Sequence, residues 1–398
     1  MKPLSEKLNN MQPSCTVAIN SKANELKRQG IDVINLSAGQ PDFNSPENVK
    51  EAGIRAIKEN RTFYTTTSGI IELKEAIIKK LKKENGLDYT TDNIIVSCGA
   101  KHSIYNAIQA ITNPGDEIII PVPYWVSYPD MVDMAGGIPV FLDADKECEF
   151  KITPEQLQEK INPKTKALIF NSPSNPTGSI YTGEEIEAIA KVIVDTDIFV
   201  ISDEIYEYLI YDNKEHISIA SFGEKIKDLT ILVNGISKSA AMTGWRIGYT
   251  AAIREIVKNM SKIQGHSTSN PTSISQYAAV EAVTTSREYA NYMLPKFDER
   301  RKYMHSYLSA LNGVEVCLPG GAFYVFPDIS SFFGKTYRDF KIEDSFSFCD
   351  YMLEEEKIAI VPGKAFGNDN CVRISYATSL DLIKEAMERF KEGLGKLS

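Results

Sequence analysis

Short apolar runs alternate with helix-like stretches between residues 93 and 251, and this alternation leaves few folds open to the chain. The strand-like runs are apolar on consecutive residues and lie at 93–97, 117–120, 138–142, 166–170, 198–202, 230–233 and 247–251. Stretches with a helical period separate several of them, as at 101–111 and 184–195. Strands that are apolar on both faces and separated by helices indicate a parallel sheet covered on both sides. We therefore predict an α/β fold on a mostly parallel seven-stranded sheet.

The tail of the chain has a different pattern. A long helical stretch, roughly 271–311, leads to strand-like runs at 314–317, 322–326, 358–361 and 372–376, with helices at 346–356 and 379–393. Before the sheet, the sequence indicates a helix at 21–28, a strand at 31–36 and an irregular loop at 37–43. We predict an N-terminal segment (1–45), a large domain (46–290) and a small α+β domain (291–398), with the last boundary inside the long helix.

Composition excludes several classes of protein. The 398 residues carry a net charge of −9, which argues against a broad nucleic-acid or anionic-membrane surface. No run of about 18 apolar residues is present, and the N-terminus has no apolar segment of the kind that secretory signals carry. Six cysteines form no CxxC pair and there are four histidines, so we expect reduced thiols, no metal site and a cytoplasmic location.

Two polar residues follow predicted strands and are candidates for chemistry. Lys238 comes after the run 230–233 and stands among small residues in GISKSAAMTGWRIGY (235–249). It is either a solvated turn residue or an amine held for a reaction. Asp203 ends the run 198–202, where a carboxylate needs a cation, hydrogen-bond donors or a helix to cap. Ligands of open α/β sheets bind beyond the carboxyl ends of the strands, so both residues point to one site.

Other motifs at the same predicted edge complete a pattern. The turn GAK (99–101) opens a helix after a strand, and free N–H groups there favour an anion such as phosphate. Arg246 offers a second phosphate contact, Trp125 is a core or stacking aromatic, and Asn175 lies in a proline-rich turn. Pyridoxal 5'-phosphate needs an amine, an acid for its ring nitrogen, a phosphate cradle and often an aromatic lid. The sequence offers all four.

These motifs, in this order, resemble those of the fold-type I pyridoxal-phosphate aminotransferases of class I/II, in the aspartate aminotransferase group. The resemblance covers essentially the whole chain. It rests on SAGQPDF (37–43), PYWVSYP (123–129), NSPSNPTG (171–178), SDEIY (202–206), SKSAAMTGWRIGY (237–249) and VRISYA (372–377).

The resemblance implies a role for each matching residue. Lys238 would form the Schiff base and move the proton, Asp203 would pair with the pyridine nitrogen, and Tyr206 and Asn175 would hydrogen-bond the ring's 3-oxygen. Trp125 would stack on the ring, and it and Asn175 would also face the substrate. The catalytic set is thus Lys238, Asp203 and Tyr206, and the expected kinetics are ping-pong.

The resemblance also implies a phosphate site, a carboxylate site and a homodimer. The residues that match the phosphate region are Ala100, Lys101, Ser237 and Arg246. Tyr64 would reach this phosphate from the neighbouring subunit, and the segment 1–45 would pack on that subunit as well as on the small domain. Arg373 would grip the α-carboxylate of the amino acid, against which Gly39 lies.

The expected substrates are L-aspartate and 2-oxoglutarate, which give oxaloacetate and L-glutamate. One acidic-specific group uses an arginine from the second subunit, and the corresponding stretch 264–270 has none. A second group resembles this chain, with a lysine matching Lys101 and hydroxyls matching Ser14 and Thr16. The alternative is that Lys101 is a solvated first-turn residue, although a cation is disfavoured at a helix N-terminus.

Other functions stay open at this stage. Members active on prephenate usually carry a basic residue where this chain has Gln12, so broader, aromatic or prephenate specificity is an alternative rather than the first expectation. A lyase of the same fold and cofactor is another. A non-catalytic binding module is disfavoured by the intact set Lys238, Asp203 and Arg373.

Overall fold

The computed structural model describes residues 11, 13 and 15–398, apart from the side chain of Cys148. The predictions for Gln12 and Ser14 fall outside the described residues. The largest sheet has the strand order β2-β8-β7-β6-β5-β3-β4. Its strands are β2 (Ile94–Ser97), β3 (Glu117–Val122), β4 (Ile138–Asp143), β5 (Thr165–Asn171), β6 (Phe199–Asp203), β7 (Thr230–Gly235) and β8 (Gly248–Ala251). β8 alone runs opposite to the other six strands, which confirms the predicted mostly parallel seven-stranded sheet.

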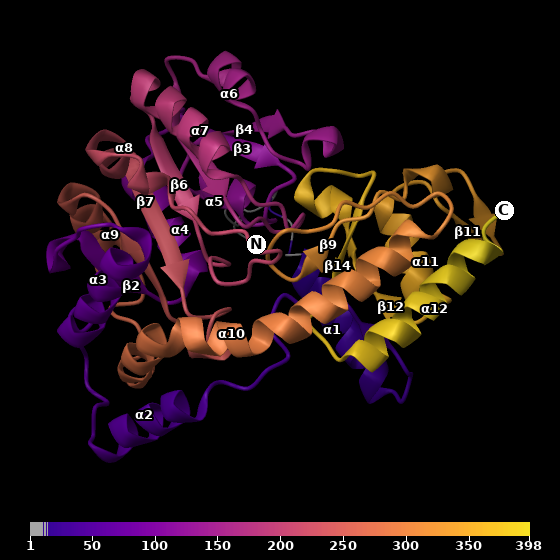
Figure 1. The fold of residues 1–398 in the computed structure, drawn as a ribbon, viewed down its shortest axis with the longest axis horizontal. Coiled ribbons are helices and arrows are strands. Elements are labelled where there is room, and N and C mark those ends of the chain that lie inside the picture. The colour runs from indigo at the N-terminus through magenta and orange to yellow at the C-terminus, as the bar shows by residue number, and fades with distance from the viewer. Residues whose placement is uncertain (1–10, 12, 14) are drawn as a thin grey trace, which may run out of the picture.

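Both faces of this sheet are buried, as the apolar runs predict. Within β5, Ala167 and Ile169 pack on one face, while Leu168 and Phe170 pack on the other. The first face is covered by α4 (Ala100–Ile111), α5 (Tyr128–Met134) and α9 (Arg254–Ser267). The other is covered by α3 (Ile71–Asn85), α6 (Pro154–Lys160), α7 (Gly183–Thr196), α8 (Glu224–Leu229) and the first part of α10 (Ser273–Ser309). Figure 1 shows these layers around the sheet.

The C-terminal part forms a second core. It contains a three-stranded sheet in the order β13-β14-β9, the β1–β12 pair and the β10–β11 hairpin. The elements are β1 (Ile34–Asn35), β9 (Tyr324–Val325), β10 (Thr336–Tyr337), β11 (Phe340–Lys341), α11 (Ser345–Glu354), β12 (Ile358–Ala359), β13 (Val361–Pro362), β14 (Val372–Ser375) and α12 (Leu380–Lys396). Two further helices, α1 (Cys15–Arg28) and α2 (Glu47–Lys58), precede the large sheet.

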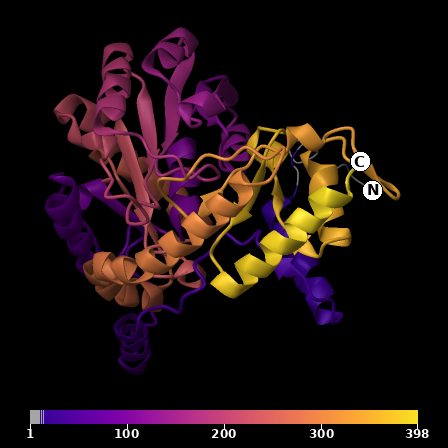
Figure 2. The same ribbon diagram turned by 45° about the vertical axis from the view of Figure 1, so that its right-hand side comes forward.

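Helix α10 links the two cores. Near its start, Ala278 and Ala282 pack with the large sheet, and farther along Phe297 and Leu308 pack with the C-terminal elements. Figures 1 and 2 show this helix running from one part of the molecule to the other. A domain boundary near residue 291, inside this helix, stays our proposal. None of the helices in the described part of the chain is both long and apolar enough to cross a bilayer.

Several predicted elements differ from those observed. The strand predicted at 358–361 is divided into β12 and β13, which belong to different sheets, and the one predicted at 322–326 is only β9. Residues 314–317 form no strand, because only Glu315 pairs, through a single bridge with Asp328. The strand predicted at 31–36 is only β1, which pairs in parallel with β12. Helix α1 begins at Cys15, before the predicted start at residue 21. In each case tertiary contacts, rather than local pattern, set the limits of the element.

Candidate functional site

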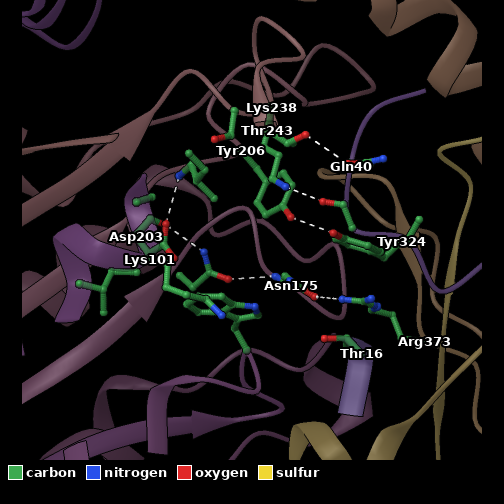
Figure 3. Close-up of a pocket in the computed structure, with 18 of the residues that line it drawn as sticks. Thr16, Gln40, Lys101, Asn175, Asp203, Tyr206, Lys238, Thr243, Tyr324 and Arg373 are labelled. Carbon is green, nitrogen blue, oxygen red and sulfur yellow. Dashed lines mark hydrogen bonds between the residues drawn. The ribbon is translucent and has the colours of Figure 1, made fainter. Parts of the chain in front are cut away.

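A cavity of about 400 Å³ lies beyond the carboxyl ends of the parallel strands. Loops that follow β2, β3, β5, β6 and β7 line it, and α1, the loop 37–40, β9 and β14 close it from the other part of the molecule. Figure 3 shows its polar side chains pointing toward a common centre. Among the described residues, every predicted site residue except Tyr64 lines this cavity.

Asp203, the last residue of β6, is 5% exposed. Its Oδ2 accepts a 2.7 Å hydrogen bond from the Tyr128 hydroxyl, and its Oδ1 accepts one of 3.3 Å from the Ile205 N–H. Burial raises the pKa of Asp203 to about 6, and the Tyr128 hydrogen bond opposes that rise. The carboxyl is therefore mostly ionised at pH 7, and it faces a cavity where a cationic N–H would be stabilised.

Lys238 lies in the loop after β7, and its side chain reaches the loop 37–40. Its Nζ donates a 2.5 Å hydrogen bond to the Gly39 carbonyl oxygen. Burial lowers the pKa of Lys238 to about 8, and the cations of Arg373 and Arg246 lower it further, whereas Asp203 opposes this. At pH 7 about a tenth of this amine is unprotonated, far more than for an ordinary lysine, and a nucleophile or base requires that form.

Arg373, on β14, is a buried cation with neutral neighbours. It is 2% exposed. Nη1 donates to Asn175 Oδ1 and Nη2 to the Ser37 carbonyl, both at 2.9 Å. Its Nε has no partner, and no carboxylate of the described residues pairs with the guanidinium. Burial lowers the pKa of Arg373, so an anionic ligand would relieve the cost of an uncompensated buried charge.

The start of α4 forms a cradle for an anion. Gly99 precedes it with φ +89° and no side-chain cap, so the first N–H groups of the helix lack partners within it. A Cβ at Gly99 would lie 2.3 Å from Arg246 Nη2, and one at Gly248 would lie 2.2 Å from the Ala100 nitrogen. Two glycines thus let Arg246 and the backbone of Ala100 come close, which fits a phosphate group.

Lys101 lies beside this cradle and turns toward Trp125. Its Nζ donates a 3.1 Å hydrogen bond to Ser127 Oγ and lies 4.8 Å from the centre of the Trp125 ring. Although Lys101 is exposed as a whole, the protein around its ammonium group partly desolvates it, and this desolvation and the Arg246 cation lower its pKa. Thr16, at the start of α1, lines the same cavity. The cavity therefore holds two lysines and two arginines, and none of these four pairs with a carboxylate of the described residues.

Tyr64 lies away from the cavity. It is 90% exposed and lines no part of the site formed by one chain. Ser237 lines the cavity and is buried. The exposure of Tyr64 is what a residue that reaches another subunit's site would show.

Sequence reasoning missed two tyrosines that line the cavity. Tyr128 donates to Asp203, and Tyr324 shares a 2.9 Å hydrogen bond with the hydroxyl of Tyr206. Tyr128 stands inside the quoted motif PYWVSYP, so its position near Trp125 was a usable signal. Tyr324 carried no such signal, because the run 322–326 reads only as an apolar strand.

Comparison with known proteins agrees with this geometry. The family model described as aminotransferase class I and II matches residues 31–390. The aspartate aminotransferase of Bacillus sp. (strain YM-2) is 50% identical, over 97% of this chain and 97% of the relative. The aspartate/prephenate aminotransferase of Cereibacter sphaeroides is 47% identical, over 99% of each.

A solved structure gives the same result. The aspartate aminotransferase from Thermus thermophilus with maleate has a TM-score of 0.93 and 42% identity, covering 99% of this chain and 100% of that chain. The family model spans most of the chain, and identities of this size extend over its whole length. The chain therefore belongs to the class I and II aminotransferases.

Proposed function

We propose that this protein is an aspartate aminotransferase that uses pyridoxal 5'-phosphate and moves an amino group between L-aspartate and 2-oxoglutarate. The observation that carries the proposal is the presence of two separate cations, Arg373 and Lys101, in one cavity without carboxylate partners among the described residues. Aspartate, 2-oxoglutarate and their products each carry two carboxylates. The names of the relatives and the maleate, a dicarboxylate, in the Thermus thermophilus structure support the same choice.

The residues present fit the cofactor. Lys238 would hold it through its amine, Asp203 would pair with its ring nitrogen, and Trp125 would stack on its ring. Its phosphate would rest on the start of α4, near Ala100, Ser237 and Arg246. When bound, the cofactor supplies an electron sink for the bond broken at Cα of the amino acid.

The chain's own residues then do the remaining work. Arg373 binds the α-carboxylate and so fixes the orientation of Cα. Lys238 Nζ, with a pKa near 8, takes the proton from Cα and, in the reverse half of the reaction, returns one to it. Asp203, held by Tyr128, keeps a negative charge in place, and Tyr206 presents a hydroxyl to the ligand.

We further propose a cytoplasmic homodimer in which Tyr64 of each chain completes the phosphate site of its partner. The support is the exposure of Tyr64 together with two exposed apolar side chains close to it in the sequence, Phe63 and Ile71. A shared site of this kind needs a two-fold interface with two equivalent cavities. Sedimentation of the purified protein measures its oligomeric state, and a fully active monomer would contradict the proposal.

Prephenate transamination is a second candidate activity. The observation in its favour is the name of the Cereibacter sphaeroides relative, an aspartate/prephenate aminotransferase at 47% identity. Gln12, the residue whose type bears on this activity, lies outside the described residues. Amino transfer from aspartate to prephenate, followed by product analysis, separates the two specificities.

The main test is direct. The purified protein is incubated with pyridoxal 5'-phosphate, and unbound cofactor is then removed. The protein should absorb light in the near-ultraviolet or visible range, and addition of aspartate should bleach this absorption. Initial rates with aspartate and 2-oxoglutarate should give parallel double-reciprocal lines. A preference for alanine over aspartate, measured by kcat/KM, would overturn the specificity, and release of ammonia without an oxo-acid acceptor would indicate a lyase instead.

A further inference from the structure

Tyr324, the first residue of β9, touches three parts of the site at once. It is fully buried, and its hydroxyl oxygen lies 2.9 Å from that of Tyr206. The guanidinium carbon of Arg373 lies 4.4 Å from the centre of its ring. A Cβ on Gly39 would come within 3.2 Å of its hydroxyl. Figure 3 shows Tyr324 between Tyr206 and Arg373, on the side opposite Lys101.

The hydroxyl pair has two possible arrangements, because each tyrosine carries one hydroxyl proton. If Tyr206 donates to Tyr324, its proton is already used. If Tyr324 donates to Tyr206, the proton of Tyr206 is left for a ligand acceptor in the cavity. Only the second arrangement lets Tyr206 donate to a ring oxygen of the cofactor, and the gap of 2.9 Å is suitable for either.

The ring has a separate effect on Arg373. An aromatic face attracts a cation without neutralising it, whereas a carboxylate partner would compete with the substrate. Arg373 lies over Tyr324 at 4.4 Å and over Phe366 at 5.0 Å, and its two described hydrogen bonds go to neutral oxygens. These contacts hold the guanidinium in place and leave its charge for a ligand.

We propose that Tyr324 is a positioning residue with two separable actions on the site. Its hydroxyl donates to Tyr206 and thereby directs the Tyr206 proton toward the ligand, and its ring holds the guanidinium of Arg373 in the orientation that receives a carboxylate. The first action rests on the proposed function, since it concerns the bound cofactor. The second concerns carboxylate binding alone and does not need the cofactor.

The charges around Tyr206 define what a pH titration reports. Burial raises the pKa of Tyr206 well above its ordinary value. The charge of Arg373 lowers the pKa of Tyr206 and that of Asp203 raises it, and Lys238 Nζ lies 5.8 Å from the centre of the Tyr206 ring. Tyr206 therefore stays protonated across the neutral range. An absorption change between pH 5 and 9 then reports the bound cofactor, not this tyrosine.

Three single variants separate the actions. Tyr324→Phe removes the hydroxyl and keeps the ring, whereas Tyr324→Leu removes both. Tyr376→Phe is a matched control, because Tyr376 is also buried and its hydroxyl donates to the Ala322 carbonyl at 3.2 Å. The midpoint temperature of thermal unfolding should be lowered by a similar amount in Tyr324→Phe and Tyr376→Phe, since each variant loses one buried hydrogen bond.

The first measurement is the pH midpoint of the absorption change of the cofactor-loaded protein. Tyr324→Phe should raise this midpoint, as Tyr206→Phe should. A Tyr206 hydroxyl that no longer accepts a hydrogen bond is a weaker donor. The ring oxygen of the cofactor would then keep its proton to a higher pH. The double variant should match Tyr206→Phe alone, since the hydroxyl of Tyr324 acts through Tyr206. A wild-type midpoint in Tyr324→Phe, additive shifts in the double variant, or an equal shift in Tyr376→Phe each overturns the action of the hydroxyl.

The second measurement is the binding of maleate, a dicarboxylate without an amino group, to cofactor-free protein by calorimetry. Tyr324→Leu should weaken it about tenfold, and Tyr324→Phe should change it less than about threefold. Equal weakening in both variants, or none in Tyr324→Leu, overturns the action of the ring. Failure of the proposed function would give a different result. Aspartate would then not bleach the absorption of the cofactor-loaded wild-type protein, whereas the maleate result would still hold.

Discussion

Arg373 and the pair Lys101 and Arg246 are cations of the same cavity in opposite settings. Arg373 is 2% exposed and held by two hydrogen bonds and two aromatic rings. Lys101 and Arg246 are exposed in the single chain, and each bonds only to neutral oxygens. The side closed by Arg373 is thus organised before a ligand arrives, whereas the other is open in the single chain and needs a ligand to order it. Changes on the first side should affect every amino-acid substrate, and changes on the second should affect dicarboxylic substrates or the cofactor.

Lys238→Ala should have the largest effect on transamination, because it removes the amine that lies between the two sides. The rate of transamination should fall at least about 10,000-fold, since one group carries attachment and proton transfer. The protein should stay folded and keep cofactor without a covalent bond. The measurement is a single-turnover assay with aspartate, and near-normal turnover contradicts the assignment of Lys238.

Arg373→Gln tests the organised side. Loss of a buried charge that binds a carboxylate should lower kcat/KM for every amino acid by about 100- to 1,000-fold. Aspartate and neutral amino acids should lose equally, because all carry the α-carboxylate. Affinity for the cofactor, measured by equilibrium dialysis, should change little. A loss confined to dicarboxylic substrates would show that Arg373 binds the distal group instead.

Lys101→Ser tests the open side. If Lys101 binds the distal carboxylate, kcat/KM for aspartate and 2-oxoglutarate should fall about 30- to 150-fold, as for a charge-assisted contact. Activity toward neutral amino acids should change much less. Lys262→Ser, at a lysine whose Nζ bonds to Asn259, is the matched surface control. An equal fall for both substrate classes would mean that Lys101 serves only the cofactor phosphate.

The pH dependence of cofactor capture comes from Lys238, which lies between the two sides. Its folded pKa of about 8 lies below its ordinary value, so the cofactor-free protein binds fewer protons than the unfolded chain between pH 8 and about 10.5. Stability should therefore rise with pH across that window, and the cost of the charged amine is fully present below it. The rate of capture should rise about 50-fold from pH 6 to pH 8, as the unprotonated fraction does, and level off above. Stopped-flow absorption measures this, and a flat profile contradicts it.

The same comparison shows how far sequence reasoning reached. Asp203, Asn175 and Lys238 were predictable because parallel strands share one carboxyl edge, so residues after different strands meet there. Packing between the two parts of the molecule was not predictable from the sequence. Tyr206 and Tyr324 are 118 residues apart, and no periodicity links them.

Arg373 illustrates the same limit on one residue. Its link to a carboxylate was implied by resemblance, but its contacts with the Ser37 carbonyl and two rings depend on how β14 lies against the loop 37–40. Local pattern predicted the elements of the large sheet well. It failed at β1 and at residues 314–317, where long-range pairing decides whether a strand forms.

Tyr64→Phe is the smallest expected change, and it tests whether the open side is completed by another chain. Tyr64 is 90% exposed here, so within one chain its hydroxyl stabilises nothing in the cavity. If it reaches the partner's phosphate, its loss should weaken cofactor binding about tenfold, the cost of one hydrogen bond to a charged group. Equilibrium dialysis measures this, and Tyr292→Phe, at another exposed tyrosine, should leave binding unchanged.

Mixed dimers sharpen this last test, because they separate the chain that supplies Tyr64 from the chain that supplies Lys238. A dimer of one Tyr64→Phe chain and one Lys238→Ala chain keeps Lys238 in a single cavity, that of the Tyr64→Phe chain. If Tyr64 acts across the interface, this cavity receives an intact Tyr64 from the Lys238→Ala chain, and its affinity for the cofactor should equal that of the wild type. If Tyr64 instead serves its own chain, the same cavity has lost the hydroxyl and should bind about tenfold more weakly.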